Sequence, residues 1–292
     1  MIKARPIALA ILALAACPPL AANAAPDPFY ERTLMSAANA RCQLFDPALA
    51  AALAASARQA RGAALRGGAD PDALAAVEAR ARARAGAVPC GSADLKLAAA
   101  RVRDAFAGYS RMRAMDFPGE HRAWRAERTQ AAPAGGGWRL SQSGASALGP
   151  ATFGIAVDAN GRESLVAVAG WPAALAASGA RLVLRDPAKA PRAYVDPRAK
   201  TLADRLPPRS ITRAILASDK AAAAPGLLPA GASAGAAFTF PASAAAALQR
   251  LDPREAVLLE LTYPSLKGER TERIPLEVGD FAAGVAFLSA AR

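Results

Sequence analysis

The stretch YSRMRAMDFPGEHRAWRAER, residues 109–128, decides the fold because the spacing of apolar residues changes within it. Before this stretch, apolar residues recur every three or four positions, which is typical of amphipathic helices. After it they alternate every second position, which predicts strands. The tripeptide Phe117-Pro118-Gly119 lies between the two patterns and marks a break in regular structure. We therefore expect an α+β protein with a helical part over residues 25–119 and a β-rich part over residues 120–292.

The helical part carries a repeated start signal. Asp is a strong N-cap because its carboxylate accepts backbone N–H groups, and Pro is favoured at the first helical position. A fourth helix is expected to start at Ser92 and to run to about Met112. Short connections between the helices predict an up-down-up-down four-helix bundle. The three Asp-Pro starts are Asp27-Pro28, Asp46-Pro47 and Asp70-Pro71.

Two cysteines test this topology. Cys42 lies near the end of the first helix and Cys90 lies just before the fourth, so both belong to the same end of the bundle. A pair of cysteines in an exported protein is usually a disulfide, although two buried free thiols are the alternative. The bridge would close a loop of about 48 residues, which the chain-entropy model values at about 4 kcal/mol.

The β-rich part is expected to be mostly antiparallel and sandwich-like. Asn160-Gly161 is a strong signal for a hairpin turn. Nine segments have the alternation of strands, namely 124–128, 138–141, 151–157, 164–169, 181–186, 212–218, 236–240, 256–263 and 271–277. Two further segments, at about 241–251 and 280–290, predict helices with one apolar face that covers a sheet. Residues 219–235 have low complexity and are expected to form a loop without regular structure.

The last third of the chain shows a recognisable order of parts. A strand ending in FTF is followed by PASAAAALQRLDP, the strand AVLLELTY, a turn, IPLEV and a closing GDFAAGVAFL. Over residues 234–290 this order resembles invasion-associated locus B-type periplasmic proteins. The resemblance implies an exported β-sandwich without known catalysis.

The N-terminus indicates export. Lys3 and Arg5 precede an uninterrupted apolar run over residues 7–16, which is typical of a secretory signal and too short to span a bilayer. Small residues then suit cleavage between Ala24 and Ala25. Residues 1–24 are therefore expected to be a signal peptide, leaving a free periplasmic or secreted bacterial protein.

A second interpretation of the same segment stays open. The sequence LAAC, ending at Cys17, is similar to a bacterial lipobox in which the cysteine is lipidated. Cleavage there would leave a membrane-anchored lipoprotein. Beyond this anchor the sequence predicts no other membrane attachment, because no later segment has 18 apolar residues without charge.

Residues able to perform chemistry are few. His121 is the single histidine of the chain, and no serine elbow, zinc-ligand set or phosphate-binding loop accompanies it. We expect no catalytic, cofactor-binding or metal-binding residues and no cofactor. The alternative is a periplasmic hydrolase whose site lies at the domain junction near Glu120 and His121. Four glutamates of the last strands are expected to form exposed cross-strand charge pairs; they are Glu255, Glu260, Glu272 and Glu277.

The formal net charge is +12, and basic residues exceed acidic ones in both parts of the chain. Arginines on the third and fourth helices are expected to form a solvated face; they are Arg80, Arg82, Arg84, Arg101 and Arg103. Nucleic acid is not expected as the partner of an exported protein. The sequence therefore favours a non-enzymatic binding or assembly module whose partner is an envelope protein or an anionic envelope component. A scaffold role without a small ligand is a third possibility.

Overall fold

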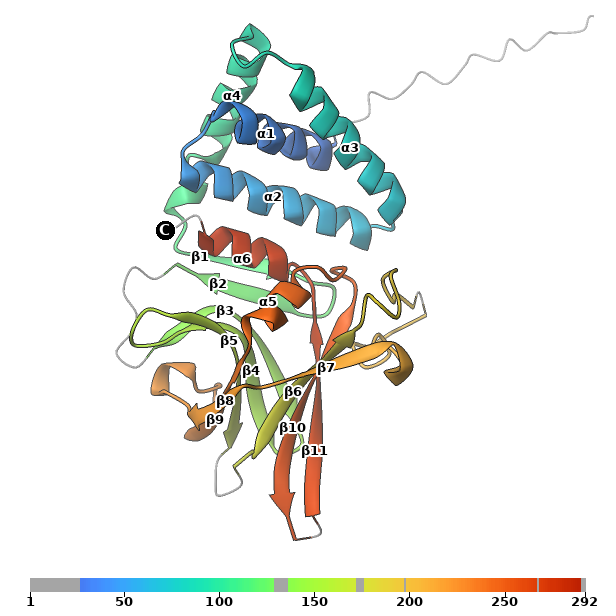
Figure 1. Cartoon of the computed structure of the whole chain (residues 1–292). Helices are drawn as coiled ribbons and strands as arrows, with labels where there is room; N and C mark the ends of the chain where they lie inside the picture. The colour runs from blue at the N-terminus through green and yellow to red at the C-terminus, as the bar shows by residue number, and fades with distance from the viewer. Residues whose placement is uncertain (1–26, 129–135, 172–175, 197, 267, 290–292) are drawn as a thin grey trace, which may run out of the picture.

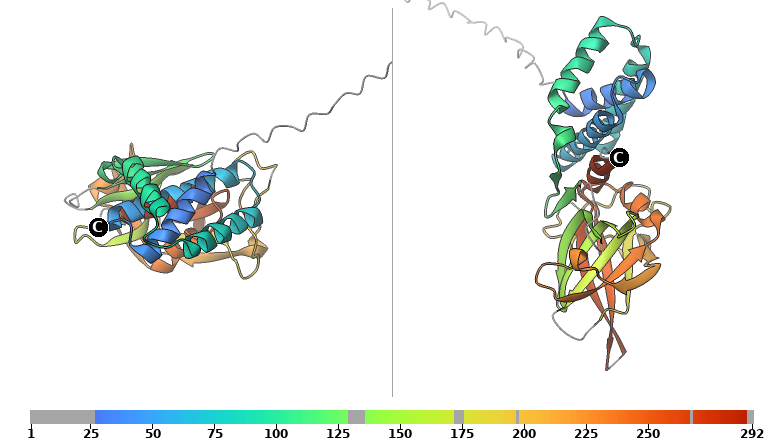
Figure 2. Two further views of the ribbon diagram at one scale, coloured as in Figure 1. Left: turned by 90° about the horizontal axis from the view of Figure 1, so that it is seen from above. Right: turned by 90° about the vertical axis from the view of Figure 1, so that its left-hand side faces the viewer.

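The computed structural model describes residues 27–128, 136–171, 176–196, 198–266 and 268–289. Within these ranges the chain forms an α+β structure in which helices precede a β-rich part, as expected (Figure 1). The helices lie at one end of two packed sheets, which is clearest in the right-hand view of Figure 2. Cys17, Ala24 and Ala25 lie outside the described residues, so the structure does not bear on the signal peptide or the lipobox.

The four N-terminal helices begin where the sequence predicts. Each N-cap side chain accepts a backbone N–H of the first turn, from Phe29 to Asp27, from Leu49 to Asp46, from Ala73 to Asp70 and from Leu95 to Ser92. These local hydrogen bonds explain why the starts could be identified from residue type alone. The helices are α1 (Pro28–Cys42), α2 (Pro47–Arg66), α3 (Pro71–Ala87) and α4 (Ala93–Phe106).

Helix α1 is the centre of the helical layer. It packs against both α2 and α3, and Figure 1 shows it lying between them. The predicted disulfide is confirmed: Cys42 at the end of α1 is bonded to Cys90 in the α3–α4 connection, with a Cα–Cα distance of 5.5 Å. The bridge closes a loop of 48 residues. It links the C-terminal end of α1 to the connection between α3 and α4.

The change of periodicity comes earlier than expected. Helix α4 ends at Phe106, six positions before Met112, and the strand β1 (Ala114–Pro118) follows a short 3-10 turn. β1 pairs with β2 (Ala123–Glu127), so Phe117-Pro118-Gly119 leads into a β-hairpin turn and does not end a helix. The reason is packing, since Phe117 faces Trp124 across the hairpin and both are buried in the core.

Two antiparallel sheets form the β-rich part, and all nine predicted strands are present. The larger sheet has the order β1-β2-β3-β4-β5-β9-β8 and the smaller one the order β11-β10-β6-β7. Asn160-Gly161 forms the β4–β5 hairpin turn as expected, with a φ of 79° at Gly161 that favours glycine. The remaining strands are β3 (Gly137–Ser146), β4 (Gly149–Val157), β5 (Glu163–Trp171), β6 (Gly179–Arg185), β7 (Thr212–Leu216), β8 (Asp219–Ala222), β9 (Ala234–Phe240), β10 (Ala256–Ser265) and β11 (Gly268–Glu277).

The expectation that residues 219–235 form an irregular loop is wrong in part. β8 pairs with β9 at the edge of the larger sheet, and Pro225–Leu227 forms a 3-10 turn. β8 is fully exposed along its length, so its stability comes from backbone hydrogen bonds to its neighbour. Alanine-rich edge strands of this kind have no apolar alternation, and that is why the sequence pattern missed it.

The two sheets enclose the main core, and a C-terminal helix joins this core to the helical layer. Helix α6 (Phe281–Ser289) packs on β1, β2 and β3 and also contacts α2, so it lies between the sheet and the helical layer (Figure 1). The short helix α5 (Ala242–Leu248) packs beside β5. Both helices cover a sheet as predicted. Among the residues with assigned positions, no helix combines the length and the apolar character that crossing a membrane requires.

Candidate functional site

The β1–β2 turn holds the two residues of the hydrolase alternative. Backbone N–H groups of Glu120, His121 and Arg122 donate to the carboxylate of Glu277 at 2.5, 2.8 and 2.8 Å. Glu277 is fully buried. Three converging N–H groups form an anion-binding nest, and here the nest is filled by a carboxylate of the protein itself. Its role is to fix the turn at the junction.

The side chains of this turn do not come together with a nucleophile. The His121 side chain is exposed and forms no hydrogen bond or ion pair with the described residues. The Glu120 carboxylate accepts a hydrogen bond from Arg205 at 2.5 Å. This hydrogen bond lowers the pKa of Glu120, which favours the ionised form and disfavours Glu120 as a proton donor.

The four glutamates expected to be exposed are all buried. Their exposed fractions are 1% for Glu255, 3% for Glu260, 8% for Glu272 and 0% for Glu277. Arginine pairing is nevertheless confirmed for three of them, although Glu272 pairs with Arg270 on its own strand and not across strands. The exposure was wrong because groups far away in sequence cover the carboxylates: arginines of β6 reach Glu255 and Glu260, the Ala147 N–H reaches Glu272, and the β1–β2 turn covers Glu277. A buried carboxylate is tolerated only where donors reach its oxygens.

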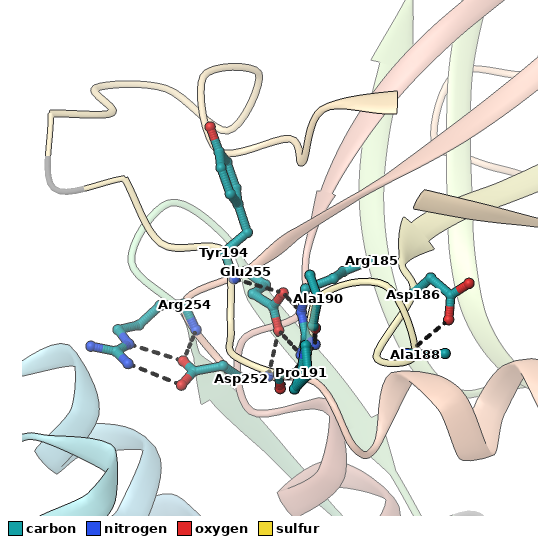
Figure 3. Close-up of polar contacts among 9 residues, drawn as sticks. All are labelled: Arg185, Asp186, Ala188, Ala190, Pro191, Tyr194, Asp252, Arg254 and Glu255. Carbon is teal, nitrogen blue, oxygen red and sulfur yellow. Dashed lines mark hydrogen bonds and ion pairs between the residues drawn. The ribbon is translucent and has the colours of Figure 1, made fainter. Parts of the chain in front are cut away.

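The ion pair between Arg185 and Glu255 anchors the long connection from β6 to β7 (Figure 3). Both side chains are at least 95% buried, and the guanidinium also donates to the carbonyl oxygen of Ala190 at 2.6 Å. Glu255 in turn accepts the backbone N–H of Tyr194 at 3.3 Å and that of Asp252 at 2.9 Å. These bonds fix the first part of the connection, residues 186–196, beside one end of the smaller sheet.

The anchored connection forms one wall of a groove on the outer face of the smaller sheet. Leu182 and Leu184 of β6 face the core, so Arg181 and Val183 face outward. The groove has a volume of about 480 Å³. We call it the arginine groove; its lining consists of Arg181, Val183, Leu206–Arg209, Thr212–Ala214, Leu258, Glu260 and Arg273.

A cross-strand triad forms the floor of the arginine groove. In the register of the sheet, Arg181 of β6, Glu260 of β10 and Arg273 of β11 lie directly opposite one another. The Nε atoms of both arginines donate to Glu260, one to each carboxylate oxygen. The Glu260 side chain is 4% exposed, whereas each arginine side chain is 51% exposed. The terminal nitrogens of two guanidinium groups are thus held in place and accessible.

The charge around the triad is positive. Arg209 also lines the groove, and Glu260 is the one carboxylate among its lining residues. Arginine presents planar donor forks that match carboxylate, phosphate and sulfate groups. The arrangement therefore suits an anion.

The groove continues past Arg181. This residue also lines an adjoining hollow of about 500 Å³, which extends toward Lys220 and Thr271. Asp219 and Glu269 lie in the second hollow, so the excess of positive charge belongs to the first. The second hollow reaches β8 and β9 of the larger sheet, so the two adjoining hollows together can accommodate an extended ligand.

The arginines of α3 and α4 form no comparable site. All five side chains are exposed, as expected for a solvated face. Arg82 pairs with Glu78 one turn earlier. Arg103 donates to the carbonyl oxygen of Leu44 at 2.7 Å and lies over the ring of Phe45, so it braces the α1–α2 connection.

Two further observations concern metal binding and similarity to known proteins. Across the described ranges, no group of three or more His, Cys, Asp or Glu side chains is placed to hold a metal ion. Comparison with family models, curated proteins and solved structures found no match. The resemblance of residues 234–290 to invasion-associated locus B-type proteins is therefore not supported by a family match. The function is accordingly inferred from the arginine groove.

Proposed function

We propose that this chain is an exported bacterial envelope protein that binds an anionic envelope component without catalysing a reaction. The observation that carries the proposal is the Arg181–Glu260–Arg273 triad on the floor of the arginine groove. Glu260 holds two guanidinium groups in a fixed orientation, so little side-chain entropy is lost when they bind an anion. The adjoining hollow leaves room for a ligand longer than a single small ion.

Export is supported by two features. The N-terminal pattern predicts either cleavage between Ala24 and Ala25 or lipidation at Cys17. The Cys42–Cys90 disulfide is typical of proteins that fold outside the reducing cytoplasm. The periplasm, either free or at a membrane surface, is therefore the compartment we propose.

The test is a binding measurement with dextran sulfate as the polyanion and uncharged dextran as its control, followed by calorimetry. The double variant Arg181→Ala/Arg273→Ala is expected to bind dextran sulfate at least tenfold more weakly, which is about 1.4 kcal/mol or more. The matched control Arg80→Ala/Arg84→Ala removes the same charge from the solvated face of α3. It is expected to change the affinity less than twofold.

A second pair of variants separates geometry from charge. Arg181→Lys/Arg273→Lys keeps both charges but cannot donate to Glu260 and to a ligand with the same planar fork. We expect it to bind almost as weakly as the alanine variant, whereas His121→Ala binds normally. Equal losses in the groove variant and in the α3 control would show that only net charge matters, and turnover that His121→Ala abolishes would favour the hydrolase alternative.

A further inference from the structure

A third hollow lies in the helical layer, on a different surface from the arginine groove. It has a volume of about 370 Å³ and is bounded by α1, α2 and α3. Figure 1 shows the arrangement of these helices, with α1 lying between α2 and α3. We call this hollow the helical cleft.

The floor of the helical cleft is mostly apolar and made of small side chains, with Thr33 and Ser36 of α1 adding two hydroxyl groups. Ala37 of α1 and Ala54 and Ala57 of α2 line it, and each is only half-buried although it lies between helices. Phe29 closes one end and is 4% exposed. Protein interiors are normally packed without such gaps. Alanine at these positions leaves apolar space that a larger side chain would fill.

The rim of the same cleft is positively charged. Arg58 and Arg61 come from α2, three positions apart, and therefore lie on the same side of the helix. Arg82 of α3 also lines the cleft but pairs with Glu78 at 2.5 Å. Neither Arg58 nor Arg61 forms an ion pair with another described residue. The cleft therefore presents two uncompensated guanidinium groups beside an apolar floor.

We propose that the helical cleft binds an anionic amphiphile, with a short acyl chain on the alanine floor and a carboxylate or phosphate head at Arg58 and Arg61. The apolar floor alone would suit any hydrophobic ligand, and the arginine pair alone would suit any anion. Their combination in one cleft selects a molecule that has both parts. A volume of about 370 Å³ is at the small end of the range for ligand sites, which fits one short acyl chain.

The first experiment uses the whole oxidised protein with dodecanoate as the probe, below its micelle-forming concentration. Acetate carries the head group without the chain, and dodecanol carries the chain without the charge. We expect calorimetry to detect saturable binding of dodecanoate with one site per chain, and binding at least tenfold weaker for acetate and dodecanol. Equal binding of acetate or of dodecanol would overturn the proposal. Dodecyl phosphate in a parallel titration identifies which head group is preferred.

Variants then locate the site. Arg58→Ala/Arg61→Ala is expected to weaken dodecanoate binding at least tenfold, whereas Arg80→Ala/Arg84→Ala, with the same loss of charge, leaves it unchanged. Ala54→Leu places an isobutyl group on the floor and is expected to block binding without altering the charge. Undiminished binding in both Arg58→Ala/Arg61→Ala and Ala54→Leu would refute the assignment.

The proposals for the arginine groove and for the helical cleft can be tested independently. Arg181→Ala/Arg273→Ala should lose dextran sulfate and retain dodecanoate, since the helical cleft shares no lining residue with the arginine groove. Thermal unfolding of each variant checks that the fold is intact. Should Ala54→Leu fail to fold, the arginine pair still tests the proposal because both side chains belong to the rim.

Discussion

Arginine side chains contribute to the fold as much as to the charge. Arg128 donates to the carbonyl oxygen of Phe287 at 2.8 Å, Arg185 to that of Ala190 and Arg103 to that of Leu44. A guanidinium has five N–H donors in a planar fork, so one side chain can satisfy several carbonyl oxygens at once. Part of the net charge of +12 therefore comes from arginines that donate hydrogen bonds to the backbone. The charge alone does not identify a ligand, and the proposed anion site rests on the Arg181–Glu260–Arg273 geometry.

Tyr109 gives a prediction for alkaline pH. Its ring packs against Phe106 and Phe287, and its buried hydroxyl has no hydrogen-bond partner among the described residues. Burial raises the pKa of Tyr109 from 10.0 to about 12. The contribution of neutral Tyr109 to stability is thus fully present below about pH 10 and is lost as the pH rises toward 12.

Between those two pH values the free energy of unfolding is expected to fall by about 1.4 kcal/mol per pH unit on account of this group. Urea unfolding of the wild type and of Tyr109→Phe at a series of pH values measures the effect. The variant should lack this part of the slope, and absorbance at 295 nm should show one fewer late-titrating phenol. An identical alkaline slope in both proteins would contradict the assignment.

At the scale of elements, local signals were predicted well, and two of the four edge strands were not predicted. The Asp-Pro helix starts follow from interactions within one turn, so residue type was sufficient. β7 and β11, the edges of the smaller sheet, were predicted, whereas β1 and β8, the edges of the larger sheet, were missed. Each edge strand depends on its single neighbour for hydrogen bonds. Neither has the apolar alternation of a central strand.

The candidate site was predictable only in part. The alternating charges of β11 and the pairing of Arg273 with a glutamate of β10 could be expected from a hairpin. Arg181 lies 79 residues from Glu260, and no local pattern shows that β6 lies beside β10. The walls of the arginine groove come from the anchored connection before β7. The groove could therefore be seen only in the folded structure.

The contact between α2 and α6 gives a prediction with an unusual sign. Replacing glycine with alanine inside a helix normally stabilises it by about 0.5–1 kcal/mol. A Cβ atom at Gly62 of α2 would instead clash with the carboxylate of Asp280, which precedes α6. We expect Gly62→Ala to destabilise the protein by about 1–3 kcal/mol.

The matched control is Gly86→Ala in α3, where a Cβ atom would meet no other group within 4 Å. This substitution is expected to have no effect or to stabilise by up to about 1 kcal/mol. Urea unfolding of both variants provides the comparison. Equal effects of the two substitutions would show that the close approach of Asp280 to α2 does not limit packing.

At the scale of the whole molecule, the helical layer and the sheets are joined by a few specific contacts. Asp280 forms two hydrogen bonds with the guanidinium of Arg66, at 2.9 and 3.0 Å. At the other end of α6, the guanidinium of Arg128 lies 3.5 Å from the centre of the Phe287 ring and donates to the carbonyl oxygen of Tyr109, which follows α4. Helix α6 is buried between the two parts, so they share apolar surface and are expected to unfold together.

The disulfide gives a prediction for the intact protein from its native host. Reduction should add the mass of two hydrogens and lower the free energy of unfolding by up to about 4 kcal/mol, measured by urea unfolding with and without reductant. The same mass spectrum locates the N-terminus. A species beginning at Ala25 in the soluble fraction supports a free periplasmic protein, and a heavier membrane-bound species beginning at a modified Cys17 supports a lipoprotein. Unchanged mass on reduction would contradict the bridge.

The ion pair between Arg66 and Asp280 joins residues 214 positions apart, and this separation has a kinetic consequence. Contacts among α1, α2 and α3 join residues at a small sequence separation and can form early. Docking of α2 against α6 instead requires closure of a very long loop. We therefore infer that the docking of the two parts is a late step of folding. Until it occurs, the outer face of α6 is exposed, and folding intermediates are vulnerable to aggregation through that face.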